Sequence, residues 1–352
     1  MRIAQIAPLT EAIPPKLYGG TERVVSWLTE ELVALGHEVT LFASGDSVTK
    51  AKLEPMWPRA LRLDGSVRDP VALHMTMLEK VRQRAEEFDL LHFHLDYYPF
   101  SLFSRQPTPY VTTLHGRLDL PEHQQVFDSF SSAPVISISE AQRRPVPQAQ
   151  WVQTIHHGLP AQLLAPRPVE PKYLACLGRI APEKAIDQAI RIAVRCGLPL
   201  KIAAKVDRVD RAYFEDEIKP LLKLPGIEFI GEISDREKPD FLSGALALLM
   251  PIDWPEPFGL VMIEAMACGT PVVAYASGSV PEIVEDGLTG FIVENEIAAA
   301  DAIEKRLPLL SRANIRARFE QRFTARRMAN DYVAVYRRLL EGHAPRLRLV
   351  KT

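Results

Sequence analysis

Two carboxylates, Glu256 and Glu264, have the spacing and surroundings to do chemistry. Seven residues separate them, and the second lies inside an apolar helix that we predict from about residue 258 to residue 266. Pro257 and Gly259 leave the amides at the start of this helix without bulky cover, and an open helix N-terminus attracts anions. Gly269 follows the last turn as an ordinary helix exit. The segment predicts an anion site, although a capping Glu256 and a buried, paired Glu264 would leave the same pattern.

Positive charge gathers at a second predicted helix entrance. Pro182-Glu183-Lys184 opens a helix that we expect to run to Cys196, directly after a strand that ends at Gly178-Arg179. Arg179 and Lys184 therefore flank a helix N-terminus, where both cations and the helix dipole favour a phosphate.

A pair of glycines, Gly19-Gly20, stands before a third helix, which we predict over residues 24–35. Bare amides at this point could approach a diphosphate. The first strand is not followed by the G-x-G-x-x-G string of dinucleotide-binding proteins. The glycine pair is thus a weak signal, which turn geometry without any ligand would explain equally well.

The absence of two motifs limits the classes of nucleotide-binding protein that the sequence predicts. The chain contains no G-x-x-x-x-G-K-[ST] string and no Asp-x-Asp pair at a strand end, so we expect neither an NTPase nor a nucleotide bridged by Mg²⁺ or Mn²⁺. Arginine and lysine would then stabilise a departing diphosphate. Glu264 suits hydrogen bonds to ribose hydroxyls, and Glu256 suits the hydroxyls and the oxocarbenium-like charge of a sugar. Together these residues predict a nucleotide-sugar ligand.

Histidines end two predicted strands of the N-terminal half. His92 and His94 alternate onto one strand face, as a metal pair would, but no third ligand has a useful spacing, so we expect packing and hydrogen bonding instead. His115, followed by Gly116, stands at the carboxyl end of the strand predicted over residues 110–114. Parallel sheets bind their ligands at that edge.

Length and composition indicate a two-domain globular protein. The 352 residues exceed the size at which one core keeps growing, and 47% hydrophobic with 24% charged residues is ordinary for a soluble protein. The formal net charge of −2 points to no polyanionic partner. From Lys305 onward positive charges exceed negative ones by ten, which we expect to reflect packing and solvated faces. We expect no nucleic-acid partner and at most a peripheral membrane contact.

Cysteine usage and hydropathy favour a cytoplasmic location. The three cysteines form no disulfide framework, the N-terminal apolar run is too brief for a signal peptide, and no window approaches 18 apolar residues.

Strands alternate with helices along the chain, which predicts an α/β fold with parallel sheets. A proline-rich stretch over 161–171 is typical of a linker, so we predict doubly wound, Rossmann-like domains over 1–163 and 164–324, and a terminal segment over 325–352. The last helix is predicted over 323–341. Residues 50–70 are expected to be irregular, and the strand at 271–275 to be the last.

The segment Glu256-Pro257-Phe258-Gly259 with Glu264 resembles the E-x7-E signature of retaining glycosyltransferases of the GT-B fold, specifically glycosyltransferase family 4. Further motifs of this resemblance follow one another along nearly the whole chain: Gly19-Gly20-Thr21-Glu22, Thr113-Leu114-His115-Gly116, Gly178-Arg179-Ile180, Pro182-Glu183-Lys184 and Gly287-Leu288-Thr289-Gly290-Phe291. The resemblance implies two domains that face across a cleft and a C-terminal helix that crosses back to the N-terminal domain.

The resemblance also implies roles for single residues. Glu256, His115, Arg179 and Lys184 would be the catalytic set. The donor would be held by Gly19, Gly20, Arg179, Lys184, Phe258, Gly259, Leu260 and Glu264, and the acceptor by Tyr18, His94, Asp96 and Arg117. The expected reaction moves a hexose from a UDP-linked donor with retention of configuration, and it needs no cofactor and no metal. Where relatives often have Lys-Gly, this chain has Lys184-Ala185, which we expect to alter the helix start slightly.

Two other classes of function remain open. A nucleotide-sugar epimerase or hydrolase of the same fold would share the phosphate-binding residues, and a two-lobed sugar-nucleotide binding protein would close on its ligand without chemistry. The acceptor is equally open among small molecules, glycans and lipids.

Overall fold

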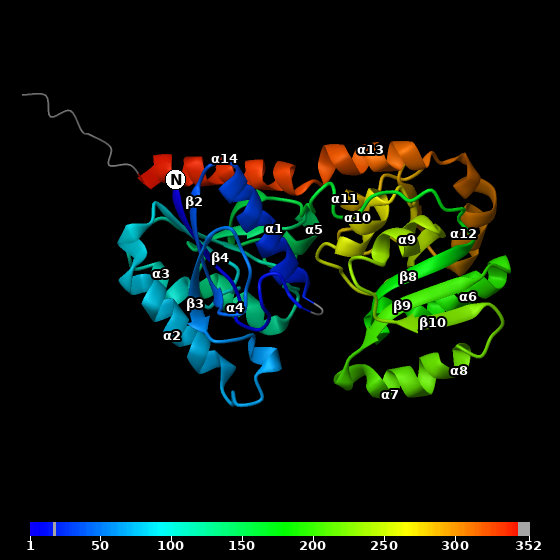
Figure 1. The fold of residues 1–352 in the computed structure, drawn as a ribbon, viewed down its shortest axis with the longest axis horizontal. Helices are drawn as coiled ribbons and strands as arrows, with labels where there is room; N and C mark the ends of the chain where they lie inside the picture. The colour runs from blue at the N-terminus through cyan, green and yellow to red at the C-terminus, as the bar shows by residue number, and fades with distance from the viewer. Residues whose placement is uncertain (17–18, 344–352) are drawn as a thin grey trace, which may run out of the picture. The chain divides into compact units, whose positions relative to one another are not determined.

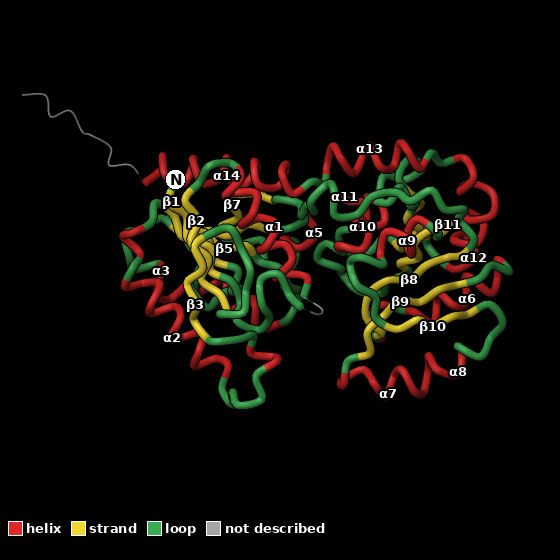
Figure 2. Tube along the Cα trace, viewed as in Figure 1, coloured by secondary structure: helices red, strands yellow, loops and turns green. Residues whose placement is uncertain are grey.

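The computed structural model describes residues 1–16 and 19–343 and divides the chain into two compact units. The first unit contains Met1–Ile138, Arg143–His156 and the chain from Ala325 onward, and the second contains Ser139–Gln142 and His157–Thr324. Each unit holds one sheet with helices around it (Figures 1 and 2).

The first unit contains a parallel sheet of seven strands in the order β3-β2-β1-β4-β5-β6-β7. The strands are β1 (Arg2–Ile6), β2 (Glu38–Ser44), β3 (Lys52–Trp57), β4 (Leu90–Phe93), β5 (Tyr110–Thr113), β6 (Pro134–Ser137) and β7 (Gln150–Thr154). The helices of this part are α1 (Gly20–Ala34), α2 (Pro70–Gln83), α3 (Phe100–Phe103), α4 (Pro121–Ser129) and α14 (Ala325–His343), while α5 (Glu140–Arg143) is divided between the units.

The second unit contains a parallel sheet of six strands in the order β10-β9-β8-β11-β12-β13. The strands are β8 (Tyr173–Ile180), β9 (Leu200–Val206), β10 (Ile227–Gly231), β11 (Ala245–Met250), β12 (Val272–Tyr275) and β13 (Gly290–Val293). The helices are α6 (Ile186–Cys196), α7 (Arg211–Tyr213), α8 (Lys219–Leu221), α9 (Lys238–Ser243), α10 (Leu260–Ala267), α11 (Val280–Ile283), α12 (Glu296–Asp301) and α13 (Arg312–Arg322).

The strand order explains where ligands can bind. In each sheet the first strand lies inside the sheet, the next strands extend to one side, and the chain then crosses to the other side, between β1 and β4 in one unit and between β8 and β11 in the other. Doubly wound sheets bind ligands outside the carboxyl ends of the strands at such a switch point. The predicted α/β class with two Rossmann-like sheets is therefore confirmed.

The last helix, α14, packs on the first unit, as the resemblance implied (Figure 1). Its buried face contains Met328, Tyr332, Val335 and Tyr336, each at most 1% exposed. Arg326 of this helix forms an ion pair of 3.0 Å with Glu31 of α1. The 3.6-residue spacing of apolar positions, visible in the sequence, thus marks the face that meets the sheet. No helix among the described residues has the length and hydropathy to cross a membrane.

Several predicted bounds were wrong. The region 50–70, expected to be irregular, contains β3, and the strand at 271–275 is followed by one more, β13. Helix α1 begins at Gly20 rather than near residue 24, and α10 begins at Leu260. The β3 strand escapes detection because it is a half-exposed edge strand that contains Pro55, and edge strands tolerate proline and lack a continuous apolar run.

Arg316 of α13 holds the start of the linker region in place. Its guanidinium donates to the carbonyl oxygens of Leu164 at 2.7 Å, Ala267 at 2.6 Å and Ala161 at 2.7 Å. One side chain thus joins α13 to the linker region and to the end of α10, because the planar guanidinium offers several donors in fixed directions.

We expect Arg316→Lys to lower the free energy of unfolding by about 2 to 4 kcal/mol, since an ammonium cannot reach all three carbonyl oxygens and leaves buried acceptors without a donor. Chemical denaturation measures the change. Arg195→Lys, at an exposed position of α6, is the matched control and should change the unfolding free energy by less than about 0.5 kcal/mol. Equal stability of the two variants would contradict the role of Arg316.

Candidate functional site

The loop between β11 and α10, which carries Glu256, needs glycine at its end. Gly259 has φ 76°, in the left-handed region, and a Cβ there would lie 2.8 Å from the Cε of Met262 and 2.9 Å from the Cε of Met250. A larger residue would be strained by the left-handed backbone and would have to displace the ends of these two methionine side chains. The sequence Pro257-Phe258-Gly259 therefore forces the chain to turn before α10 begins.

A second glycine holds the other side of this loop. Gly278, with φ 56°, packs so tightly on Glu256 that a Cβ would lie 2.3 Å from its backbone nitrogen and oxygen. The next residue, Ser279, donates its N–H to the carbonyl of Glu256 at 2.9 Å and its hydroxyl to the carbonyl of Phe258 at 2.8 Å. The backbone from 256 to 258 is thus fixed before any ligand arrives.

The carboxylate of Glu256 lies in a compact group with Lys184 and Trp254. The Lys184 ammonium forms a short ion pair with Oε2 of Glu256, and the indole N–H of Trp254 donates to the same oxygen at 3.1 Å. The Lys184 nitrogen also lies 4.9 Å from the centroid of the Trp254 ring, within cation–π range. Both loops follow the neighbouring strands β8 and β11, so the switch point brings together residues 72 positions apart.

Arg179 lies at the end of β8, as predicted, and its charge is balanced within the unit. Its guanidinium forms ion pairs of 2.5 Å with Asp210 and of 2.5 Å with Glu183. The two predicted phosphate-binding cations, Arg179 and Lys184, are therefore both oriented by carboxylates in this structure. An incoming phosphate would compete with these carboxylates or share the cations with them.

The helix after Lys184 does not begin as predicted. Pro182–Lys184 forms a 3₁₀ turn, Ala185 adopts left-handed backbone angles (φ 48°, ψ 48°), and α6 starts at Ile186. Such a conformation costs a residue with a Cβ about 1–2 kcal/mol. Alanine at this position therefore introduces strain at the point where the helix amides become available.

Glu264 is buried within α10 and paired with a lysine that the sequence did not single out. Its side chain accepts a hydrogen bond from the Lys238 ammonium at 2.6 Å, and Lys238 forms a second ion pair of 3.1 Å with Asp235. Glu264 is 3% exposed and Lys238 is 8% exposed. The structural alternative considered for Glu264, a buried paired carboxylate, thus describes its surroundings, and its predicted role at the ribose stays a prediction.

The predicted residues of the first unit lie at the carboxyl ends of β1, β4 and β5. His115 is partly buried, and its Nε2 lies 2.9 Å from Nδ1 of His94; burial lowers the pKa of His115 to about 3. Gly20 opens α1, and a Cβ on Gly19 would lie 2.8 Å from a carboxylate oxygen of Glu22.

The four predicted acceptor residues differ in exposure. Asp96 and Arg117 are exposed, and Arg117 pairs with Asp119 at 2.7 Å. His94 is only 3% exposed and lies in the interior, with its Nε2 2.8 Å from the side-chain oxygen of Gln5. Tyr18 lies outside the described residues. The acceptor roles of all four stay predictions.

Sequence reasoning missed Trp254, Lys238 and Asp210. Trp254 stands two residues before Glu256, and this closeness was a signal that could have been used. Lys238 and Asp210 are far from their partners in sequence, so their contribution follows only from the fold.

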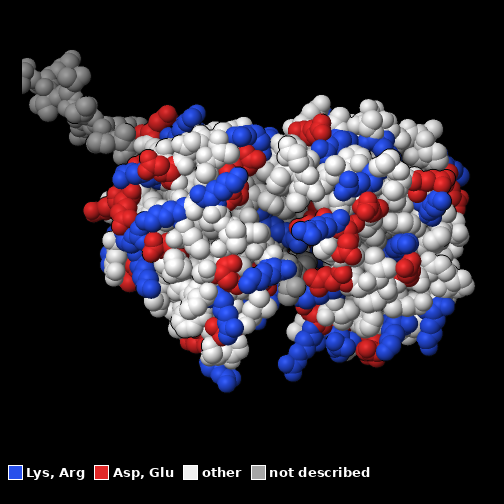
Figure 3. Space-filling view, in the orientation of Figure 1, with Lys and Arg blue, Asp and Glu red and all other residues white. Residues whose placement is uncertain are grey.

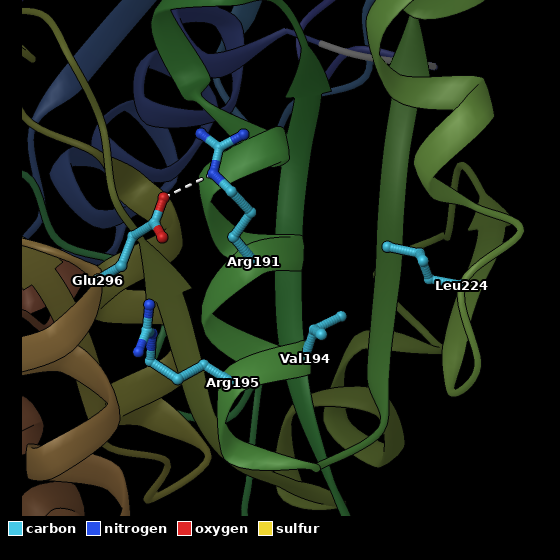
Figure 4. Close-up of a pocket in the computed structure, with 5 residues that line it drawn as sticks. All are labelled: Arg191, Val194, Arg195, Leu224 and Glu296. Carbon is cyan, nitrogen blue, oxygen red and sulfur yellow. Dashed lines mark hydrogen bonds and ion pairs between the residues drawn. The ribbon is translucent and has the colours of Figure 1, made fainter.

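Other features of the surface do not add to this site. A hollow of about 470 Å³ is lined by Arg191, Val194, Arg195, Leu224 and Glu296, none of which belongs to the predicted donor residues (Figure 4). Positive and negative side chains are interspersed over the visible face of each unit (Figure 3). Within the described ranges no group of three or more His, Cys, Asp or Glu side chains could hold a metal ion.

Comparison with known proteins now defines the class. Residues 18–158 match the family described as "Glycosyltransferase Family 4", and residues 165–326 match the one described as "Glycosyl transferases group 1". Sucrose-phosphate synthase from Thermosynechococcus elongatus has a similar fold, with a TM-score of 0.76 and 22% identity, over 97% of this chain and 99% of that one. HepE of Anabaena, solved with UDP and glucose, gives a TM-score of 0.70 and 21% identity over 96% and 100%.

A curated relative supports the same class. D-inositol 3-phosphate glycosyltransferase of Mycobacterium tuberculosis is 34% identical over 196 residues, which is 51% of this chain and 40% of that protein. The matched part thus spans less than half of the relative's length. These findings define a chain of the GT-B fold that carries two domain models of glycosyltransferase families. More specifically, the chain belongs to glycosyltransferase family 4.

The strain at Ala185 can be measured by comparing two variants of buried alanines. In Ala185→Gly and Ala189→Gly a buried methyl group is lost and the unfolded chain gains freedom, but only the first relieves a left-handed backbone. We therefore expect Ala185→Gly to be less destabilising than Ala189→Gly by about 1–2 kcal/mol in chemical denaturation. An equal loss of stability at both positions would show that Ala185 is not strained.

Proposed function

We propose that the protein is a retaining glycosyltransferase that moves a hexose from a UDP-linked sugar to an acceptor without a bound metal. The observation that carries the proposal is the group of Lys184, Trp254 and Glu256, held rigidly before α10 in a chain of family 4. Two structures of one protein of similar fold add support, since HepE was crystallised with UDP and with UDP-glucose.

The residues suggest how charge is handled during transfer. Arg179 and Lys184 would stabilise the negative charge that develops on the departing diphosphate, which is the task a metal ion performs in other transferases. As Lys184 turns toward the diphosphate, the carboxylate of Glu256 becomes available to the sugar hydroxyls and to oxocarbenium-like charge. Glu264 would accept hydrogen bonds from the ribose while Lys238 holds its carboxylate in place.

His115 is expected to act as a neutral group in this reaction. Its pKa is lowered to about 3, so it remains uncharged at neutral pH and offers hydrogen bonding rather than positive charge to the sugar. The acceptor is proposed to be a small molecule, a glycan or a lipid; the inositol phosphate named for the curated relative makes a small polyol a sensible first candidate. We also propose the cytoplasm as its location, in keeping with three free cysteines.

The function is tested by nucleotide release. UDP-glucose, GDP-mannose and UDP-N-acetylglucosamine are each tested as the donor. We expect UDP to be released from UDP-glucose only when an acceptor is present, and we expect EDTA to leave the rate of release unchanged. NMR of the product should show the anomeric configuration of the donor. Glu256→Gln should abolish transfer while donor affinity largely survives. Release of UDP without an acceptor would favour a hydrolase. Inversion at C2 of the free donor would favour an epimerase, and donor binding without UDP release would favour a binding protein.

The phosphate-binding roles are tested by calorimetry with UDP. We expect Arg179→Ala and Lys184→Met each to weaken UDP binding by about 10- to 150-fold, because each removes charge-assisted bonds of about 1.5–3 kcal/mol. Lys201→Ala, on β9 of the same unit, is the control and should bind UDP as the unmodified protein does.

A second variant separates two causes of weaker binding at Lys184. Loss of the lysine also leaves the charge of Glu256 uncompensated, which by itself would repel a phosphate. Lys184→Met combined with Glu256→Gln removes that repulsion. If the double variant regains full affinity, Lys184 acts only by neutralising Glu256, and its proposed contact with the diphosphate is refuted.

A further inference from the structure

The core of the first unit contains a continuous chain of hydrogen-bonded polar side chains that ends at His115. It joins Gln5 of β1, His92 of β4, His94 directly after β4, Thr113 of β5, and Tyr332 and Tyr336 of α14. All except His115 are at most 3% exposed. Buried polar groups of this kind are expensive unless every donor meets an acceptor, so the direction of each bond is constrained.

The amide of Gln5 sets the direction toward His115. Its oxygen lies 2.8 Å from Nε2 of His94, and because a carbonyl oxygen only accepts, Nε2 of His94 must carry the proton. The other nitrogen of a neutral His94, Nδ1, then accepts. It lies 2.9 Å from Nε2 of His115, which must therefore be the protonated nitrogen of that ring.

The same amide sets the direction toward α14. Its nitrogen lies 3.3 Å from the Tyr336 hydroxyl, which accepts from it and in turn donates to Nδ1 of His92 at 2.7 Å. His92 is then protonated on Nε2, and it donates to the Thr113 hydroxyl at 2.7 Å. That hydroxyl lies 3.0 Å from the hydroxyl of Tyr332. Every bond is consistent with one orientation of one amide.

Neutral rings are required throughout. An imidazolium inside this buried chain would lose its contact with water, which is costly. Burial lowers the pKa of His92 well below its usual value and that of His115 to about 3. His92 and His115 consequently each have a single proton, whose position is decided by the neighbouring groups.

We propose that Gln5 is a positioning residue that, through His94, fixes His115 as the neutral tautomer protonated on Nε2, and that Tyr336 of α14 completes the chain behind His92. The proposal gives α14 a part in the polar network of the core in addition to its part in packing. Its importance for transfer rests on the proposed function, in which His115 meets the sugar, whereas the tautomer itself is a property of the folded protein.

The test is NMR of the full chain with ¹⁵N-labelled histidine, in which protonated and unprotonated ring nitrogens give distinct resonances. His115 is assigned from the signal that disappears in His115→Gln. In the unmodified protein at neutral pH we expect His115 to be protonated on Nε2 alone. A His115 protonated on Nδ1 would overturn the proposal without any variant of the network.

Two variants and a control test which residue determines the tautomer of His115. Gln5→Met removes the acceptor of His94 and should convert His115 to a mixture of tautomers, while Tyr336→Phe should change the signals of His92 and leave His115 as it was. Thr112→Val is the matched control: it removes a buried hydroxyl of β5 that lies outside the chain and should change no histidine signal. An unchanged His115 in folded Gln5→Met would refute the role of Gln5.

Activity measurements separate this inference from the proposed function. Gln5→Met should lower kcat at least tenfold, and Thr112→Val should not. If the NMR results are as expected but no donor supports transfer, the proposed function fails and the fixed tautomer stands. If transfer occurs and kcat of Gln5→Met equals that of the unmodified protein, Gln5 has no positioning role in the reaction.

Discussion

The ion pair of Lys184 and Glu256 is the interaction around which the second unit's site is built. It joins the loops after β8 and β11, which adjoin only because the strand order reverses between them. Two glycines, Gly259 and Gly278, allow the Glu256 loop to lie where the lysine reaches it. The pair also keeps two opposite charges partly out of water, which is favourable only while both are present. A diphosphate would offer Lys184 a stronger partner, so ligand binding would be expected to separate the ion pair that the structure shows.

The sequence permitted most of the fold to be predicted, because alternating apolar strands and amphipathic helices leave strong local patterns. The strand over 110–114 and the last helix over 323–341 were predicted to within two residues of their bounds for that reason. The exceptions are elements whose stability comes from neighbours. The edge strand β3 is half exposed, and β13 is an edge strand that begins at Gly290, so neither shows a clear apolar periodicity in the sequence.

The candidate site was predictable where backbone geometry requires a particular residue, and less so where side chains meet across the fold. Gly259 is required by a left-handed turn, and such a requirement is visible in sequence as a motif. By contrast, the partners of Glu264 and Arg179 are lysine and aspartate residues of ordinary appearance, Lys238 and Asp210. Charges of this kind are abundant on any surface, and only the tertiary structure distinguishes those that are buried and paired.

The two units solve the problem of buried polarity in opposite ways. The second unit uses ions, since Arg179, Lys184 and Lys238 each pair with carboxylates. The first unit uses neutral groups, in which one amide orders three imidazoles and the phenol of Tyr336. Ionic groups respond strongly to the charge of a ligand, whereas a neutral chain presents a fixed pattern of donors and acceptors that a change of charge nearby disturbs little. The reaction that we propose would expel an anionic diphosphate and transfer an uncharged sugar, and it would benefit from this division: the residues proposed to meet the changing charge are charged, and those proposed to orient hydroxyl groups are neutral.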